Sequence, residues 1–267
     1  MTGAREFAAE VYRRNRLLAV LGWLHLAALA VILLVAPFDT RTVTGINPWI
    51  KPMKFLVSIT VYVWTLAWLL EYVSSYRRAV RLVSWGTAVV FVGEMACIIT
   101  QAARGVTSHY NVETPFDSAV FSTMGFLIFF NTLLVLLTLA LFARPTARLP
   151  PAYLWGIRLG LLLFFLGSLE GMAMISNMAH TVGQPDGGPG LPFVNWSTRS
   201  GDLRVAHFLS FHALQLLPLA GHALSRRAVV GTRGRQLACV FALALVYLLV
   251  TTLLFWQAMR GRPLIDL

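Results

Sequence analysis

Charged residues are scarce in this 267-residue sequence: Asp, Glu, Lys and Arg make up only 12% of it, while 57% is hydrophobic. Soluble domains carry about twice that share of charge. The apolar residues gather in runs of about 20, the length at which a helix crosses the hydrocarbon core of a bilayer. The composition excludes an ordinary soluble enzyme and predicts an integral membrane protein.

Cysteine is also rare, with only Cys97 and Cys239 in the chain. They fall at different depths of two predicted spans, whereas a disulfide needs Cα atoms within about 7 Å of one another. We therefore expect two free thiols that pack as small apolar side chains.

Acidic residues are half as frequent as basic ones, 11 against 22, which gives a net charge of +11. No stripe of base-stacking aromatics accompanies the arginines, so nucleic acid is not expected as a partner. Instead, the arginines gather before the first apolar run and then in every second connection. They are Arg5, Arg13, Arg14 and Arg16, then Arg77, Arg78 and Arg81, then Arg144 and Arg148, and finally Arg226, Arg227, Arg233 and Arg235. By the positive-inside rule these segments lie in the cytoplasm, which places the N-terminus inside and the C-terminus outside.

The apolar runs predict an all-α fold, a polytopic membrane bundle of seven transmembrane helices. The runs cover residues 16–37, 52–73, 80–103, 118–142, 152–176, 203–224 and 235–258. We expect a short basic cytoplasmic lead over 1–15, a single transmembrane domain over 16–258 and a C-terminal tail over 259–267. The first residues lack the apolar core and cleavage site of a signal peptide. Together with a composition typical of a GC-rich bacterial genome, this predicts a multi-pass protein of the bacterial cytoplasmic (inner) membrane.

One predicted span begins with an unusually polar stretch, GDLRVAHFLSFHALQ, residues 201–215. An ionisable residue at mid-span costs roughly 2.5–3.5 kcal/mol and normally faces the protein interior. At 3.6 residues per turn, Arg204, His207, His212 and Gln215 fall on one side of the helix. We expect this side to line a cavity that opens to the outer surface. Asp202 precedes the helix and is expected to be its N-cap.

Two other spans carry matching polar faces. Glu94, Gln101 and Arg104 share a face of one span, and Glu170 and Asn177 share a face of another. Glu94 lies about ten residues below the outer end, or roughly 15 Å.

His212 lies at a similar depth, which predicts a hydrogen-bonded Glu94–His212 pair that shares a proton. The predicted catalytic residues are Glu94, His212 and Glu170. The predicted substrate-binding residues are Gln101, Arg104, Arg204, Asn177 and Gln215. The alternative is that these groups only tie helices together, but such bonds contribute about 0.6 kcal/mol each and a dozen polar residues exceed that need.

The histidines leave two cofactor hypotheses open. His207 with His109 and His180 from the loops would form a transition-metal site. His25 opposite His212 would form a bis-histidine haem site. A metal-free acid–base pair is the third possibility, since Glu94 and His212 suffice for proton transfer to a lipophilic substrate.

Two smaller features carry predictions of their own. Lys51 and Lys54 break the positive-inside pattern, so we expect them to contact headgroup phosphates or, alternatively, Glu113 or Asp117. The spacings Gly156-xxx-Gly160 and Gly167-xxx-Gly171 are typical of close helix packing.

Four segments, INPWIKPMKF, QAARGVTSHYNVETPFD, HTVGQPDGGPGLPFVNWST and GDLRVAHF, carry a resemblance. With them, most of the chain resembles a widespread, functionally uncharacterised family of bacterial seven-helix integral membrane proteins. The resemblance implies the fold and the inner-membrane location, and no activity, cofactor or catalytic residue. The seven-helix hydrolases that include alkaline ceramidases use a His-xxx-His pair, whereas here the spacing is His207-xxxx-His212, so that match is poor.

The favoured interpretation is a membrane-embedded enzyme or cofactor protein whose partners are the lipid bilayer and a lipophilic small molecule, such as an isoprenoid, quinone or lipid. A transporter or proton-coupled carrier is the first alternative, although no inverted repeat is visible. A receptor or membrane assembly factor, with the long outer loops as its partner surface, is the second.

Overall fold

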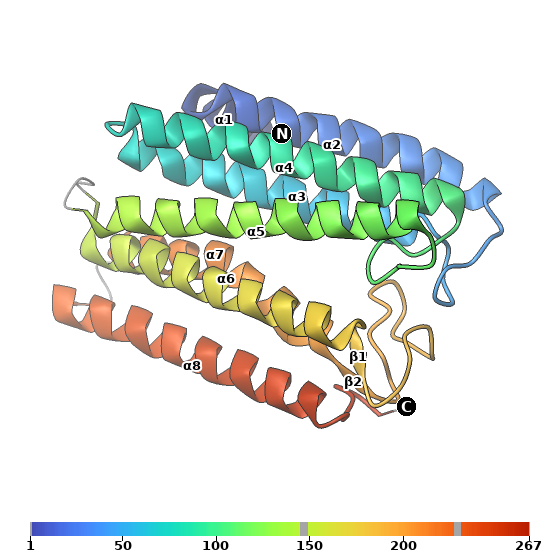
Figure 1. Cartoon of the computed structure of the whole chain (residues 1–267). Coiled ribbons are helices and arrows are strands. Elements are labelled where there is room, and N and C mark those ends of the chain that lie inside the picture. The colour runs from blue at the N-terminus through green and yellow to red at the C-terminus, as the bar shows by residue number, and fades with distance from the viewer. Residues whose placement is uncertain (1, 145–148, 227–230, 267) are drawn as a thin grey trace. The chain divides into compact units, whose positions relative to one another are not determined.

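The computed structural model describes residues 2–144, 149–226 and 231–266. Arg148 and Arg227, two of the predicted cytoplasmic arginines, lie outside these residues. The described residues form eight α-helices and one two-stranded sheet, which confirms the all-α class (Figure 1). The chain divides into two compact units, Met1–Leu137 and Thr138–Leu267. That residues 16–258 form a single transmembrane domain stays a prediction.

Six helical segments of the described residues are long and apolar enough to cross a membrane. They are α2 with the 3-10 turn η1 (Arg16–Val35, Ala36–Phe38), α3 with η2 (Ile50–Leu70, Glu71–Val73), α4 (Arg77–Arg104), α5 (Pro115–Ala143), α6 (Pro151–Asn177) and α8 (Arg233–Met259). The chain is thus a multi-pass helical membrane protein. The remaining long helix, α7 (Leu203–Arg226), is less apolar because of its polar residues, and its role as a seventh span stays a prediction.

The predicted basic lead is itself a helix, α1 (Thr2–Arg14), in the first unit. It packs against α2 and α3 of this unit. Phe7 contacts the rings of Trp64 and Trp68 on α3, and Val11 is only 2% exposed. The spacing of Phe7 and Val11, four residues apart, places both on one face of the helix, which explains its docking.

The core of the first unit follows the helical period. Along α3, Leu56, Ile59, Val63 and Leu66 are buried, a spacing of three and four residues that keeps one stripe toward α2 and α4. Val57 on the same helix is 46% exposed. Large exposed apolar side chains of this kind are expected where lipid is the solvent.

In the second unit, α6, α7 and α8 pack together, and α7 lies directly against α6 (Figure 1). Glycines set this approach. A Cβ added to Gly156 would lie 2.4 Å from the Leu217 carbonyl oxygen, and one on Gly160 would lie 2.8 Å from that of Ala213. The predicted role of the glycine spacing in helix packing is confirmed.

A short antiparallel sheet closes one end of the second unit. β1 (Thr181–Val182) pairs with β2 (Gly201–Asp202), so the two ends of the long loop between α6 and α7 are joined. A Cβ on Gly201 would lie 1.9 Å from the carbonyl oxygen of Ala258, so the sheet also rests on the end of α8.

Candidate functional site

The predicted site residues divide between the two units. The first unit holds Glu94, Gln101, Arg104 and His109, and the second holds Glu170, Asn177, His180, Arg204, His207, His212 and Gln215. The predicted Glu94–His212 pair draws one residue from each unit, and it stays a prediction.

Glu94 is the one carboxyl group of α4, and it is buried. The residue is 1% exposed, and its Oε2 atom has no hydrogen-bond partner within the described residues. The charge that acts on it electrostatically is Lys51, at the start of α3. A buried carboxyl group with an unused oxygen is costly, and natural proteins keep such groups chiefly where they serve a function.

Lys51 joins a second polar group of the same unit. Its Nζ atom lies 3.1 Å from Nδ1 of His109, and the Ser108 hydroxyl lies 3.1 Å from the same nitrogen. A lysine ammonium carries only donors, so Nδ1 accepts and the ring proton lies on Nε2. Aromatic rings surround this imidazole: Phe55 at 6.0 Å and Tyr110 at 5.9 Å between centroids.

Asp117, at the start of α5, binds the polar side chains at the C-terminal end of α4. Its carboxylate accepts hydrogen bonds from Gln101 (2.8 Å), from Arg104 and from the Thr114 hydroxyl (2.5 Å), while its own N–H donates to Thr114 at 3.1 Å. Thr114 and Asp117 thus form a reciprocal N-terminal cap. Gln101 is fully buried. Both predicted substrate-binding residues of α4 are held in this internal network, and their contact with a substrate stays a prediction.

In the second unit, Glu170 and His207 lie on the α6–α7 contact. Glu170 accepts a hydrogen bond from Ser210 at 3.1 Å, and its other oxygen is buried without a partner in the described chain. Nδ1 of His207 lies 2.8 Å from the carbonyl oxygen of Gly167. That contact requires a proton on Nδ1, so Nε2 of the neutral ring carries the lone pair. The ring also packs against Phe211 in a tilted arrangement, with 4.1 Å between centroids and 48° between the ring planes.

Asn177, the last residue of α6, and His180 hold the start of the long loop. Nδ1 of His180 lies 2.5 Å from Asp186, whose carboxylate also accepts from the Thr181 hydroxyl at 2.7 Å. Burial raises the pKa of Asp186, but the hydrogen bonds and charge from His180 outweigh it and lower that pKa well below its usual range. Asn177 donates to the carbonyl oxygens of Ala179 and Thr181.

Arg204 forms an ion pair with Asp202, whose side chain is fully buried. Asp202 accepts from the Arg204 N–H at 3.0 Å and from the Ser197 N–H at 2.8 Å. The N-cap prediction for Asp202 is confirmed. The guanidinium also donates to the carbonyl oxygen of Asn195, so Arg204 ties the loop to α7.

Two further histidines use their own helices as partners. His212 contacts the carbonyl oxygen of Phe208 at 2.7 Å, and His25 contacts that of Leu21 at 2.8 Å, each through Nδ1. In both the backbone fixes the ring orientation. Gln215 is half-buried on α7.

Among residues 2–144, 149–226 and 231–266, no group of three or more His, Cys, Asp or Glu side chains is arranged to hold a metal ion. His180 is engaged by Asp186, and His109 lies in the other unit from His180 and His207. The metal hypothesis and the haem hypothesis, whose His25 and His212 come from different units, both stay predictions.

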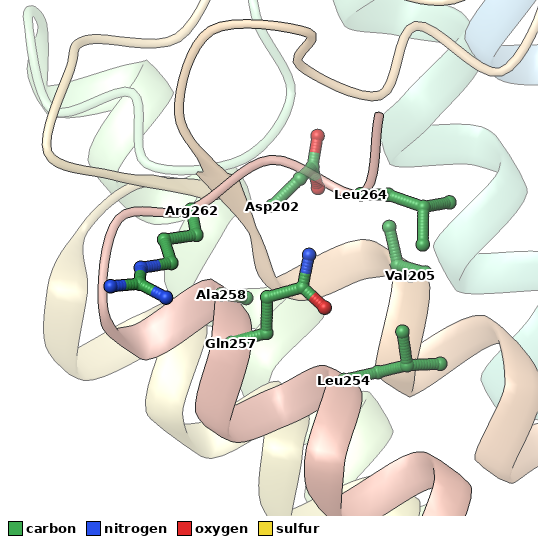
Figure 2. Close-up of a pocket in the computed structure, with 7 residues that line it drawn as sticks. All are labelled: Asp202, Val205, Leu254, Gln257, Ala258, Arg262 and Leu264. Atoms are coloured by element: carbon green, nitrogen blue, oxygen red, sulfur yellow. The ribbon is translucent and has the colours of Figure 1, made fainter. Parts of the chain in front are cut away.

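A small cavity lies between the start of α7 and the end of α8 (Figure 2). Asp202, Gln257 and Arg262 are among the residues that line it, and its volume is about 10 Å³. That is room for one water molecule. This cavity is too small for a substrate.

Comparisons with protein-family models, with curated proteins and with solved structures found no match for this chain. The family resemblance stays a prediction. The function has to be argued from the site itself.

The sequence interpretation missed the link between Lys51 and His109. The expected contact of Lys51 with a headgroup, Glu113 or Asp117 stays a prediction; its Nζ atom lies 3.1 Å from Nδ1 of His109, and Asp117 pairs with Arg104. The available signal was that Lys51 breaks the positive-inside pattern. The Thr114-Pro-Phe-Asp117 sequence, a capping box followed by an apolar run, is a second signal, which indicates where α5 begins.

Proposed function

We propose that this chain is a membrane-embedded enzyme that performs acid–base chemistry on a lipophilic substrate, with Glu94 as the proton donor or acceptor. The observation that carries the proposal is the buried Glu94 carboxyl group in a candidate membrane span of the first unit, with one oxygen that has no hydrogen-bond partner among the described residues. Proton transfer by a positioned side chain contributes roughly 10²- to 10⁴-fold to a reaction rate.

Lys51 and His109 supply the remaining parts of the site. Lys51 acts electrostatically on Glu94 and donates a hydrogen bond to His109 at 3.1 Å. His109 keeps an N–H group on Nε2 that can donate a hydrogen bond to a polar atom of a substrate. The rings of Phe55 and Tyr110 give this part of the site an apolar surface, which supports a lipophilic substrate.

The test uses the Glu94→Gln variant, which keeps the shape of the side chain and cannot exchange a proton. Purified protein is reconstituted with a total lipid extract of bacterial membranes, and the lipids are followed over time by mass spectrometry. We expect the wild type to convert at least one lipid species, and Glu94→Gln to convert it at least about 100-fold more slowly. Glu113→Gln is the matched control, because Glu113 is exposed in the loop before α5.

A wild-type protein that changes no lipid would contradict the proposal. So would a correctly folded Glu94→Gln protein that reacts at the wild-type rate.

A second candidate function is a proton-coupled carrier. The observation in its favour is that Glu170 of the second unit, like Glu94, is a span carboxyl group with one oxygen lacking a partner among the described residues. Two such groups suit proton relay in a transporter. Proteoliposomes discriminate the two functions: a carrier acidifies its lumen in response to an added substrate gradient, and an enzyme does not.

We further propose that α7 is a seventh span, with the N-terminus in the cytoplasm. Its 24 residues measure about 36 Å at 1.5 Å per residue, enough to cross the hydrocarbon core. In a background without Cys97 and Cys239, a membrane-impermeant thiol reagent should label Gly188→Cys in intact cells and leave Ser75→Cys unlabelled. Gly188 has open space around it and Ser75 is exposed, so both thiols are accessible. Labelling of Ser75→Cys alone would reverse the topology.

A further inference from the structure

A cavity of about 370 Å³ opens in the first unit, where α2, α3 and the start of α4 meet. It lies at the other end of α4 from Gln101, Arg104 and the Asp117 network. The polar part of its wall includes Arg14, Glu71, Arg77 and Arg81. Three arginines and one glutamate thus line the cavity, and although Arg14 is paired with Glu10, the balance of charge is positive and favours an anionic ligand.

The three arginines differ in how they are engaged. Arg14 donates to Glu10 at 2.7 Å and to the Trp68 carbonyl oxygen at 3.1 Å, and its guanidinium lies 3.9 Å over the Trp68 ring. The side chains of Arg77 and Arg81 make no hydrogen bond or ion pair with any described residue. Their charge is therefore available to a ligand.

The backbone at the start of α4 adds to this positive charge. α4 begins at Arg77, and its N-cap residue, Tyr76, provides no side-chain hydrogen bond. The first N–H groups of a helix are unsatisfied within it and carry partial positive charge. In α4 they lie in the same turn as Arg77, so backbone and side chains attract an anion together.

The apolar part of the wall indicates where the rest of the ligand lies. Leu17, Leu70 and Trp85 line the cavity, and Trp85 is 59% exposed. Further along α4, Val89 is 62% exposed. A ligand with its anionic group in the cavity can thus place an acyl chain along this apolar helix face. A soluble phosphate has no acyl chain and would make no contact with the face.

We propose that this cavity binds the phosphate headgroup of an anionic phospholipid, with Arg77 and Arg81 as its charged contacts. This assignment rests on the proposed topology, which places this end of α4 at the cytoplasmic surface, where basic pockets between membrane helices hold such headgroups. Glu71 in the wall accepts a hydrogen bond from a headgroup hydroxyl, which favours phosphatidylglycerol over a headgroup without hydroxyls.

The experiment is native mass spectrometry of the full chain after incubation with equal amounts of phosphatidylglycerol and phosphatidylcholine that share the same acyl chains. We expect the wild type to retain phosphatidylglycerol preferentially. Arg77→Gln/Arg81→Gln should lower that preference roughly tenfold or more, and each single variant should lower it in part. Arg78→Gln is the control, because Arg78 is exposed on the same turn and does not line the cavity.

Two results would overturn the proposal. The first is a double variant, folded by circular dichroism, that keeps the wild-type preference, or an Arg78→Gln protein that loses it equally. The second is displacement of the lipid by millimolar glycerol 3-phosphate, which would assign the cavity to a soluble phosphate. The lipid assignment predicts no displacement, because the headgroup alone lacks the acyl-chain contacts.

Discussion

Replacing Gly156 by leucine is expected to remove most of the folded protein from the membrane. The Cβ of any residue at this position would lie 2.4 Å from the Leu217 carbonyl oxygen, and 3.0 Å from its carbonyl carbon. Overpacking costs roughly 1–3 kcal/mol where side chains can shift. Here the obstacle is backbone, so α6 and α7 must separate along their length. A total stability of about 5–15 kcal/mol does not absorb that loss.

The measurement is the monodisperse fraction of fluorescently tagged protein in detergent on size exclusion. Gly125→Leu is the control, since Gly125 lies in α5 with nothing within 4 Å of its added Cβ. This variant makes the same glycine-to-leucine change in a helix where no neighbouring backbone lies close to the added side chain. We expect the control to stay near the wild-type yield. Wild-type yield of Gly156→Leu would show that α6 and α7 do not approach as closely as the backbone places them.

The sequence predicted the helices well because lipid leaves few alternatives. A run of apolar residues can satisfy its backbone in the hydrocarbon core only as a helix. The predicted run 152–176 corresponds to α6, Pro151–Asn177, and 235–258 corresponds to α8, Arg233–Met259. The sequence analysis did not predict the helix α1. Phe7 and Val11 have helical spacing, but the many polar residues around them leave too few apolar positions to show a periodic pattern.

The sequence predicted which polar residues are buried, but only some of their hydrogen-bond partners. Burial of polar faces follows from helical period, and Glu94 and Gln101 are indeed buried. Partner choice depends on distances between helices, which the period does not contain. His25, His207 and His212 use backbone carbonyl oxygens, and no pattern of side chains reveals such acceptors. In each of these histidines the contact uses Nδ1, so Nε2 is the nitrogen that a metal or haem would take, and the cofactor hypotheses stay predictions.

Replacing Asp202, at the end of the long loop between α6 and α7, is expected to have the second large effect on stability. The Asp202 side chain is fully buried and accepts hydrogen bonds from the Ser197 N–H, the Arg204 N–H and the Arg204 guanidinium. Removal of one partner of a buried ion pair costs roughly 3–5 kcal/mol, because the other charge is left uncompensated. Loss of an N-cap alone costs about 0.5–2 kcal/mol. The two losses coincide at this single carboxylate.

Asp202→Ala should therefore destabilise the protein by roughly 3–5 kcal/mol, seen as a large fall in the thermal unfolding midpoint in detergent. It should also expose the loop before α7 to protease, because Arg204 then no longer connects Asp202 and Asn195. The unfolding midpoint of Asp202→Asn should lie between those of the wild type and Asp202→Ala. Its amide oxygen can still cap α7, although the negative charge is gone. Glu113→Ala removes an exposed carboxylate and should change neither readout. If Asp202→Ala and Asp202→Asn melt together near the wild type, the ion pair does not hold the loop, and the strand pairing of Thr181 with Asp202 must do so through the backbone alone.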